Sequence, residues 1–317
     1  MDVLNMFIEY LPSTEDIKIL KNIEVDNEIL DSIKADLMED LIKYDALSPD
    51  LKYNVNPVFK WHSEVIESIF EGITSLYDVL LLVRFSFNTK LGNKILIFNL
   101  SAYFNCYGIH SKSCSCSKIC YAGKLAIRQL KKTISNYVFY QYVKRTNNLK
   151  LLELGIIYGV NKAVESVKGS ISDLKAIRFN EVGEIKDSQD LFYMELIYYY
   201  LRQFKKNLKA YTYTTNKEFI ELLKTSDIVI RISAGLKPEA IDQHYYNSWS
   251  VIVEPENIKT IKESVESKGF KFVLCQGTCK KCISCSHKNN VIGFVNHSGT
   301  SSEALKLKIN ECMELIQ

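Results

Sequence analysis

Eight of the nine cysteines fall into two groups of four, and this grouping is the clearest chemical signal in the chain. The first group has the spacing C-x7-C-x-C-x3-C and consists of Cys106, Cys114, Cys116 and Cys120. The second group has the spacing C-x3-C-x2-C-x2-C and consists of Cys275, Cys279, Cys282 and Cys285. Thiolates are soft donors that suit zinc and iron–sulfur centres, and short spacings let one loop wrap a single centre. Both groups are therefore predicted to bind metal.

Two kinds of metal centre are open to these thiolates. Closed zinc sites would only stabilise the loops that carry them. A zinc finger usually has two C-x-x-C hooks with a spacer between them, whereas each group here is one dense run, which favours iron–sulfur ligation. We expect one or two iron–sulfur clusters of the [4Fe-4S] type, with zinc as the alternative. The ninth cysteine, Cys312, lies on the apolar face of a predicted helix and is expected to be a core residue.

A second set of candidate residues follows the predicted strands. In "RFNEVGE" (178–184) an arginine could hold a carboxylate or phosphate, a carboxylate could accept a hydrogen bond from an amino group, and the glycine allows a tight turn. The alternative without a binding role is a solvated loop with an internal Arg–Glu pair. Three more polar side chains come from the next two strands. The predicted cofactor-binding set is Arg178, Asn180, Glu181, Gly183, Glu184, Tyr213, Arg231 and Ser233.

These residues need elements that bring strand ends together. After Asn88, short β-rich apolar segments alternate with amphipathic helices, which is typical of βα units around a parallel sheet. The six candidate strands lie within residues 94–104, 174–185, 208–215, 227–235, 250–255 and 270–275. No glycine-rich phosphate-binding motif follows the first strand, so the pattern favours a partial or distorted parallel (βα) barrel over a Rossmann sheet.

The N-terminal part of the chain differs in charge from the rest. Residues 1–60 carry 13 acidic and 6 basic side chains, whereas the remaining residues carry 34 basic and 24 acidic ones. One helix is predicted within residues 26–47, with Ile29, Ile33, Leu37, Leu41 and Ile42 near one face, and a second is predicted over 62–83. We therefore expect an acidic helical N-terminal region over residues 1–87 and a cysteine-rich α/β domain over residues 88–317.

Composition and hydropathy indicate the compartment in which the protein is expected to lie. With 317 residues and 47% apolar side chains the chain can bury a sizeable core. Its first residues lack the pattern of a signal peptide, and its longest apolar run, interrupted by Asp78 and Arg84, is too short to cross a bilayer. A cytoplasmic protein without a membrane partner is the expectation. In that reducing compartment clustered cysteines favour metal ligation over disulfides.

Several sequence segments, taken in order, resemble those of one known protein family. The segments "NTKLGNKILIFNLSAYFNC", "CSKICYAGKLA", "RFNEVGEIKDSQDLF", "AYTYTT", "IVIRISAG" and "CQGTCKKCISCSHKNNVIGFVNHSG" occur in this order. In this order they resemble the "gene product 88" family of bacteriophages, and the resemblance covers residues 88–299. It implies a cysteine-rich α/β protein but no particular activity.

The same layout is more distantly similar to radical S-adenosylmethionine enzymes. In those proteins a cysteine loop follows the first strand of a partial barrel and a Gly-Glu turn follows the second. Here the counterparts are Cys116-x3-Cys120 and the turn that contains Glu184, but no third cysteine follows Cys120 at the expected spacing. If Cys106 completes a trio and Cys114 is spare, one iron is open and could chelate S-adenosylmethionine. If all four cysteines bind, the cluster is closed.

Two functions from different classes follow. The first is an iron–sulfur protein, and more narrowly a radical S-adenosylmethionine-like enzyme with an unknown substrate. The second is a metalloprotein without catalysis, in which zinc or closed clusters shape a binding surface for nucleic acid or a protein partner. The tyrosine-rich segment "FYMELIYYYLRQF" could stack nucleobases, although a buried helix explains it as well.

Overall fold

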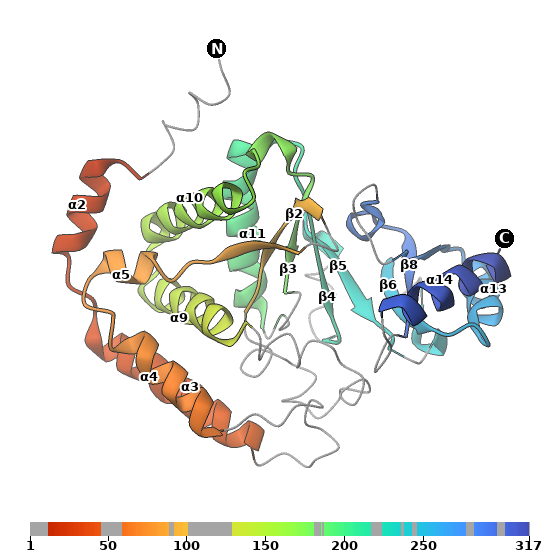
Figure 1. Ribbon diagram of the computed structural model, residues 1–317, viewed down its shortest axis with the longest axis horizontal. Coiled ribbons are helices and arrows are strands. Elements are labelled where there is room, and N and C mark those ends of the chain that lie inside the picture. Colours follow the sequence, from red (N-terminus) through yellow and green to blue (C-terminus); the bar gives the residue numbers. More distant parts are fainter. Residues whose placement is uncertain are drawn as a thin grey trace.

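An open eight-stranded sheet organises the chain (Figure 1). The computed structural model describes residues 12–45, 59–88, 92–100, 129–180, 185, 187–216, 224–235, 238–242, 246–276, 282–296 and 302–316. The strands are β1 (Phe85–Asn88), β2 (Gly92–Phe98), β3 (Ala176–Phe179), β4 (Lys209–Thr214), β5 (Val229–Ser233), β6 (Ser248–Val253), β7 (Lys271–Leu274) and β8 (Asn290–Val295). Their spatial order is β1-β2-β3-β4-β5-β6-β8-β7.

All pairings are parallel except that of β1 with β2. The strands β2 to β8 therefore end at one edge of the sheet, which we call the carboxyl edge, and begin at the opposite amino edge. The predicted α/β class with a parallel sheet is confirmed. The strands β3, β4, β5 and β7 lie within predicted segments, and β2 and β6 overlap theirs but begin two residues earlier. The sheet has two further strands, β1 at one side and β8 between β6 and β7.

Helices cover one face of this sheet. They include α9 (Leu130–Thr146), α10 (Leu149–Ser166), α11 (Ser188–Phe204), α13 (Ile258–Ser267) and α14 (Ser302–Ile316). Alternate strand residues such as Leu96, Ile177 and Ile230 are fully buried and share one apolar core with these helices. Cys312 of α14 is part of that core, and burial raises the pKa of its thiol to about 11. Its interpretation as a core cysteine fits this position.

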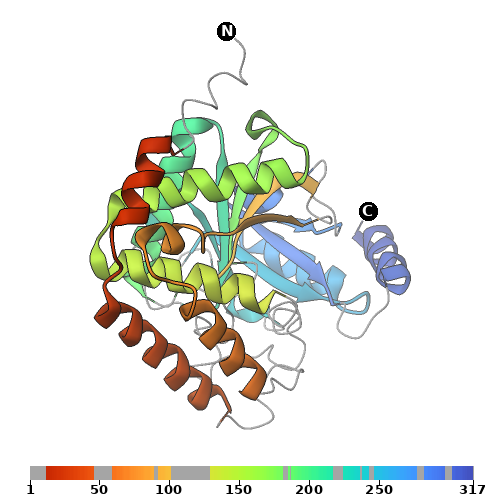
Figure 2. The same ribbon diagram turned by 60° about the vertical axis from the view of Figure 1, so that its left-hand side comes forward.

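The N-terminal helices extend the same core. They are α2 (Thr14–Asn22), α3 (Asn27–Asp45), α4 (Phe59–Phe70) and α5 (Leu76–Leu80). Both α3 and α4 pack against α9, and Figure 2 shows α3 and α4 side by side. On α3, Ile33, Leu37 and Leu41 are buried as predicted, but the side chain of Ile42 is 57% exposed. Helices from both sides of residues 87/88 share one core. The predicted division of the chain at this point stays a prediction.

The helix predicted over 62–83 is two helices. The first, α4, ends at Phe70, and Ser75 and Asp78 form a capping box that starts α5. Asp78 accepts hydrogen bonds from Thr74 and Ser75, and these bonds outweigh its desolvation and lower the pKa of its carboxyl group. None of the helices in the described part of the chain is long and apolar enough to span a membrane.

Candidate functional site

The face of the sheet opposite the helices carries a second, smaller apolar cluster. Its buried members are Ile95, Ile97, Ala176, Tyr211 and Val229, and Tyr213 and Cys285 pack against it. The 3-10 helix η4 (Ser284–Ser286) contacts β4 on this side. We call this surface the inner face.

The sheet curls toward the inner face. The rings of Tyr213 on β4 and Phe294 on β8 lie 5.6 Å apart, centroid to centroid, although β5 and β6 stand between their strands. In a flat sheet such strands would be about 14 Å apart, because neighbouring strands are separated by about 4.8 Å. The approach of these rings across two intervening strands indicates that the sheet bends toward the inner face, which makes this face concave.

Arg178 and Tyr213, two of the predicted site residues, lie together on this face near the carboxyl edge. The guanidinium carbon of Arg178 is 5.4 Å from the centroid of the Tyr213 ring, a cation–π distance. Burial raises the pKa of Tyr213 well above its usual value, with the neighbouring Cys285 adding to this and Arg231 opposing it. Tyr213 is therefore a neutral phenol whose hydroxyl can donate a hydrogen bond. That oxygen is buried and has no partner within the described residues.

Asn180 holds the segment that leads toward the first cysteine group. Its backbone N–H donates to the Phe98 carbonyl at 2.9 Å, and its side-chain oxygen accepts from the Leu100 N–H at 3.3 Å. Its backbone is left-handed, with φ 51°, and its side chain is buried. Its Nδ2 has no partner in the described parts of the chain. Asn180 thus joins the exit of β2 to the exit of β3 and leaves one buried donor available at the carboxyl edge.

Asn136 of α9 holds the same exit from the other side. Its Nδ2 donates to the carbonyl oxygens of Asn99 and Arg84, each at 2.9 Å, and its Oδ1 accepts from the Arg84 N–H at 2.6 Å. Asn136 is not among the site residues predicted from the sequence. The available signal was a lone amide in the otherwise apolar and aromatic stretch "ISNYVFY", where a buried amide needs backbone partners.

We expect the left-handed conformation of Asn180 to separate two substitutions. Both Asn180→Gly and Asn180→Ala remove the hydrogen bond to Leu100, but alanine also has to adopt a backbone conformation that costs a side-chain-bearing residue about 1 kcal/mol. Asn180→Ala should therefore lower the free energy of unfolding in urea by about 1 kcal/mol more than Asn180→Gly. Equal losses for the two variants would show that the conformation is not maintained in solution.

Arg231, also predicted to bind a cofactor, is fully buried and directs its N–H groups at backbone and amide oxygens. Its Nε donates to the Cys285 carbonyl at 2.9 Å. Nη1 donates to the Trp249 and Asn290 carbonyls at 3.2 and 3.0 Å, and Nη2 donates to the Ser284 carbonyl at 3.0 Å. Nη2 also contacts the His287 carbonyl and the Asn290 side chain. The geometry makes Arg231 the anchor of residues 284–290, which contain Cys285, the last member of the second cysteine group, and the residues after it.

The hydroxyl of Ser233 also has a local partner. It accepts a hydrogen bond from the Gly235 N–H at 3.4 Å, in a turn where Gly235 has a φ of 56°. A left-handed residue of this kind favours glycine. Ser233 lies at the end of β5, and in the described structure it supports this turn.

The cysteines are only partly described. The first group, Cys106 to Cys120, lies outside the described residues, as do Glu181, Gly183, Glu184 and Cys279. Of the second group, Cys282 is exposed, while Cys275 and Cys285 are partly buried. No three Cys, His, Asp or Glu side chains gather as a metal site in the part of the chain that the structure describes. Cys275, Cys282 and Cys285 therefore do not form a metal site by themselves as they lie.

The comparisons with known proteins add no relative. No protein-family model, no curated protein and no solved structure matches the chain. Three features of this chain therefore indicate its function: a concave inner face, Arg178 and Tyr213 on that face, and two strand exits joined by Asn180 at the carboxyl edge.

Proposed function

We propose that the chain is an iron–sulfur protein whose first cysteine loop carries a cluster at the carboxyl edge of the sheet, and that it acts as a radical S-adenosylmethionine-like enzyme. The observation that carries the proposal is the pair of hydrogen bonds between Asn180 and the exit of β2. The segment with Cys106, Cys116 and Cys120 leaves the sheet after Leu100, and the segment with Glu181 and Glu184 leaves it after Asn180. The two predicted halves of the site therefore begin side by side.

The arrangement of the sheet supports a partial (βα) barrel as the scaffold. The strands β2 to β6 follow one another in space in the order of the sequence, all parallel. The helices lie on the opposite face, and the curl that brings Tyr213 to Phe294 makes the inner face concave. In barrels of this kind the carboxyl ends of the strands hold the chemistry.

The described donors suit a ligand with a carboxylate and hydroxyl groups. The guanidinium of Arg178 can pair with a carboxylate, and the phenol of Tyr213 and the Nδ2 of Asn180 can each donate one more hydrogen bond. S-adenosylmethionine carries an α-carboxylate, an amino group and ribose hydroxyls, and a carboxylate of Glu181 or Glu184 would complement its amino group. A cluster bound by Cys106, Cys116 and Cys120 would supply an electron and one open iron.

The second cysteine group has a weaker claim to a metal. Three of its four thiols are described and do not gather, and Arg231 holds the backbone of Cys285 and of Asn290. We therefore assign the proposed chemistry to the first loop alone, and metal binding by the second group stays a prediction.

Reductive cleavage of S-adenosylmethionine tests the enzymatic part of the proposal. The anaerobic, cluster-loaded protein is reduced with dithionite, incubated with S-adenosylmethionine, and assayed for methionine and 5′-deoxyadenosine. We expect both products, and at least a tenfold lower yield from Arg178→Gln than from Arg202→Gln, an exposed control. A loaded and reduced protein that forms neither product would contradict the enzyme and favour a binding module.

A further inference from the structure

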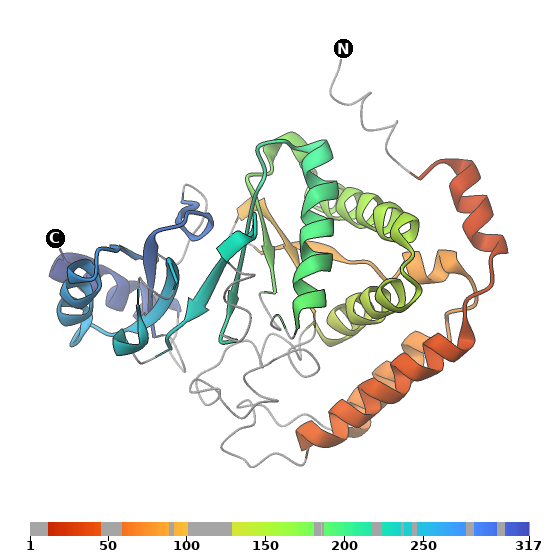
Figure 3. The same ribbon diagram turned by 180° about the vertical axis from the view of Figure 1, so that it is seen from behind.

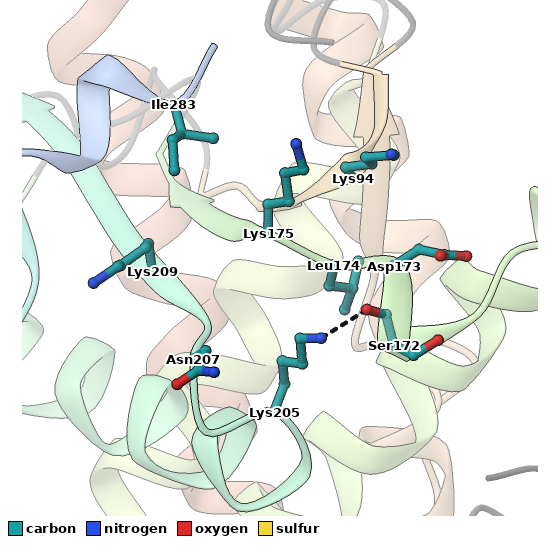
Figure 4. Close-up of a pocket in the computed structure, with 9 residues that line it drawn as sticks. All are labelled: Lys94, Ser172, Asp173, Leu174, Lys175, Lys205, Asn207, Lys209 and Ile283. Atoms are coloured by element: carbon teal, nitrogen blue, oxygen red, sulfur yellow. Dashed lines mark hydrogen bonds between the residues drawn. The ribbon is translucent and has the colours of Figure 1, made fainter. Parts of the chain in front are cut away.

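A lysine-lined pocket lies at the amino edge of the sheet, opposite the proposed cluster. It has a volume of about 410 Å³. Figure 4 shows its lining residues, which are Lys94, Ser172, Asp173, Leu174, Lys175, Lys205, Asn207, Lys209 and Ile283. Four of these side chains are basic and one is acidic. Neither proposed half of the carboxyl-edge site uses this pocket.

Three of the lysines form a row of hydrogen-bonded backbone positions across neighbouring strands, with Lys209 in register with Ala176, the residue after Lys175. The Lys175 N–H donates to the Lys94 carbonyl at 2.8 Å, and the Lys209 N–H donates to the Lys175 carbonyl at 3.0 Å. All three side chains are exposed, and no carboxylate among the described residues forms an ion pair with them. The fourth, Lys205, donates to the Ser172 carbonyl at 2.7 Å. Figure 4 shows the ammonium groups spread around the pocket, not converging on one point. Such a spread suits an extended polyanion better than a single phosphate.

An exposed aromatic stripe leads along α11 to this pocket. Phe192 and Tyr199 are 52% and 59% exposed, and a spacing of seven residues places them on one side of the helix, about 10 Å apart along its axis. Lys206 follows Tyr199 by another seven residues, just beyond the end of α11, and is exposed. In Figure 3, which shows the molecule from behind, α11 lies in front of the sheet.

The charges beside the stripe are mixed but favour an anion. Glu195 lies between the two rings, and Asp227 pairs with Arg202 at 3.3 Å between the carboxylate oxygen and Nη1. Asp173 is the acidic residue that lines the pocket itself. The row Lys94, Lys175 and Lys209, together with Lys205 and Lys206, outnumbers these acidic residues.

We propose that α11 and the lysine row bind a single-stranded nucleic acid without sequence preference. The lysines would contact phosphates, and Phe192 and Tyr199 would stack on bases. A single strand is favoured over a duplex because stacking on an exposed ring needs a base whose face is free. The lysines and aromatic rings that carry this inference belong to neither cysteine group, so its test is separate from that of the proposed enzyme.

Fluorescence anisotropy with the full-length protein tests it. The probes are a labelled oligo(dT) and oligo(U) of about 15 nucleotides, a duplex of the same length, and inorganic polyphosphate as a competitor. We expect both single strands to bind more tightly than the duplex. In Lys175→Ala/Lys209→Ala the affinity should fall at least tenfold. Because two phosphate contacts are lost, the slope of log K against log salt should become shallower by about 1.4.

Matched controls separate this site from general attraction. Lys259→Ala/Lys306→Ala removes two exposed lysines on α13 and α14, and should leave binding unchanged. Tyr199→Ala should weaken single-strand binding at least fivefold and leave polyphosphate binding unchanged, whereas Leu307→Ala, which shortens another exposed side chain, should do neither. No single-strand binding by the unmodified protein, or equal losses from the two lysine pairs, would overturn the proposal. If Lys175→Ala/Lys209→Ala lowers the affinity for single strands but Tyr199→Ala does not, the site binds polyanions without base stacking, and the stacking part of the proposal is refuted.

Discussion

Replacing Arg231 with methionine is expected to lower the free energy of unfolding by about 4 kcal/mol, because several buried oxygens lose a charged donor at about 1–3 kcal/mol each. The guanidinium is fully buried and donates to six oxygens. Five are backbone carbonyl oxygens of residues 249, 284, 285, 287 and 290, and the sixth is the side-chain oxygen of Asn290. Methionine fills much of the volume but donates none of these hydrogen bonds, although the Ser284 carbonyl still accepts from the His287 N–H and from Nδ2 of Asn290. Chemical unfolding in urea, followed by circular dichroism, measures the difference.

Two further variants make the Arg231 prediction specific. Arg231→Lys keeps the charge but offers three donors on one nitrogen, so it should lose about half as much stability. Arg202→Met removes an arginine that is 45% exposed in a surface ion pair, and should change stability by less than about 0.5 kcal/mol. If Arg231→Met unfolds no more easily than Arg202→Met, residues 284–290 are not anchored as described.

The second large effect is expected from the first cysteine loop. Cys116→Ser and Cys120→Ser should each abolish iron and sulfide incorporation at this loop, because a serine hydroxyl at neutral pH is a poor substitute for a thiolate ligand. Cys106→Ser should do the same if it completes the trio, whereas Cys114→Ser should retain the cluster. Iron and acid-labile sulfide per chain, measured after anaerobic purification, give the result.

A core cysteine supplies the control for this series. Cys312 is fully buried in α14 with a pKa raised to about 11, so it is a poor thiolate donor. Cys312→Ala should leave the iron and sulfide content unchanged. Loss of the cluster in Cys114→Ser to the same extent as in Cys120→Ser would show that all four thiols bind and that the site is closed, which contradicts an open iron.

The sheet was largely predictable from the sequence because parallel strands, buried on both faces, appear as short apolar runs between amphipathic helices. The additional strand β1 has only four residues and follows a long apolar run that resembles a helix, so its pairing with β2 was not predicted. Its stability comes from distant contacts, such as the packing of the Phe85 ring 5.1 Å from that of Phe98. The strand β8 follows a cysteine segment, and its position between β6 and β7 is a long-range feature that periodicity does not encode.

The arrangement of the site residues also depends on long-range contacts that periodicity does not encode. Strand alternation, taken together with the observed register, places Arg178, Tyr213 and Arg231 on one face, since side chains two residues apart point the same way. It does not show that residues more than fifty positions later would take up the donors of Arg231. Nor does it show that Asn180 would turn left-handed and bond to Leu100, eighty positions earlier. Both depend on which distant backbone oxygens or N–H groups the fold brings within reach.

Metal and sulfide analysis tests the central claim most directly. The full-length protein is purified without oxygen, and its iron, acid-labile sulfide and zinc are measured per chain. The proposed function predicts about four iron and four sulfide per cluster, with zinc well below one per chain. Stoichiometric zinc without labile sulfide would contradict it and identify the cysteine groups as zinc sites.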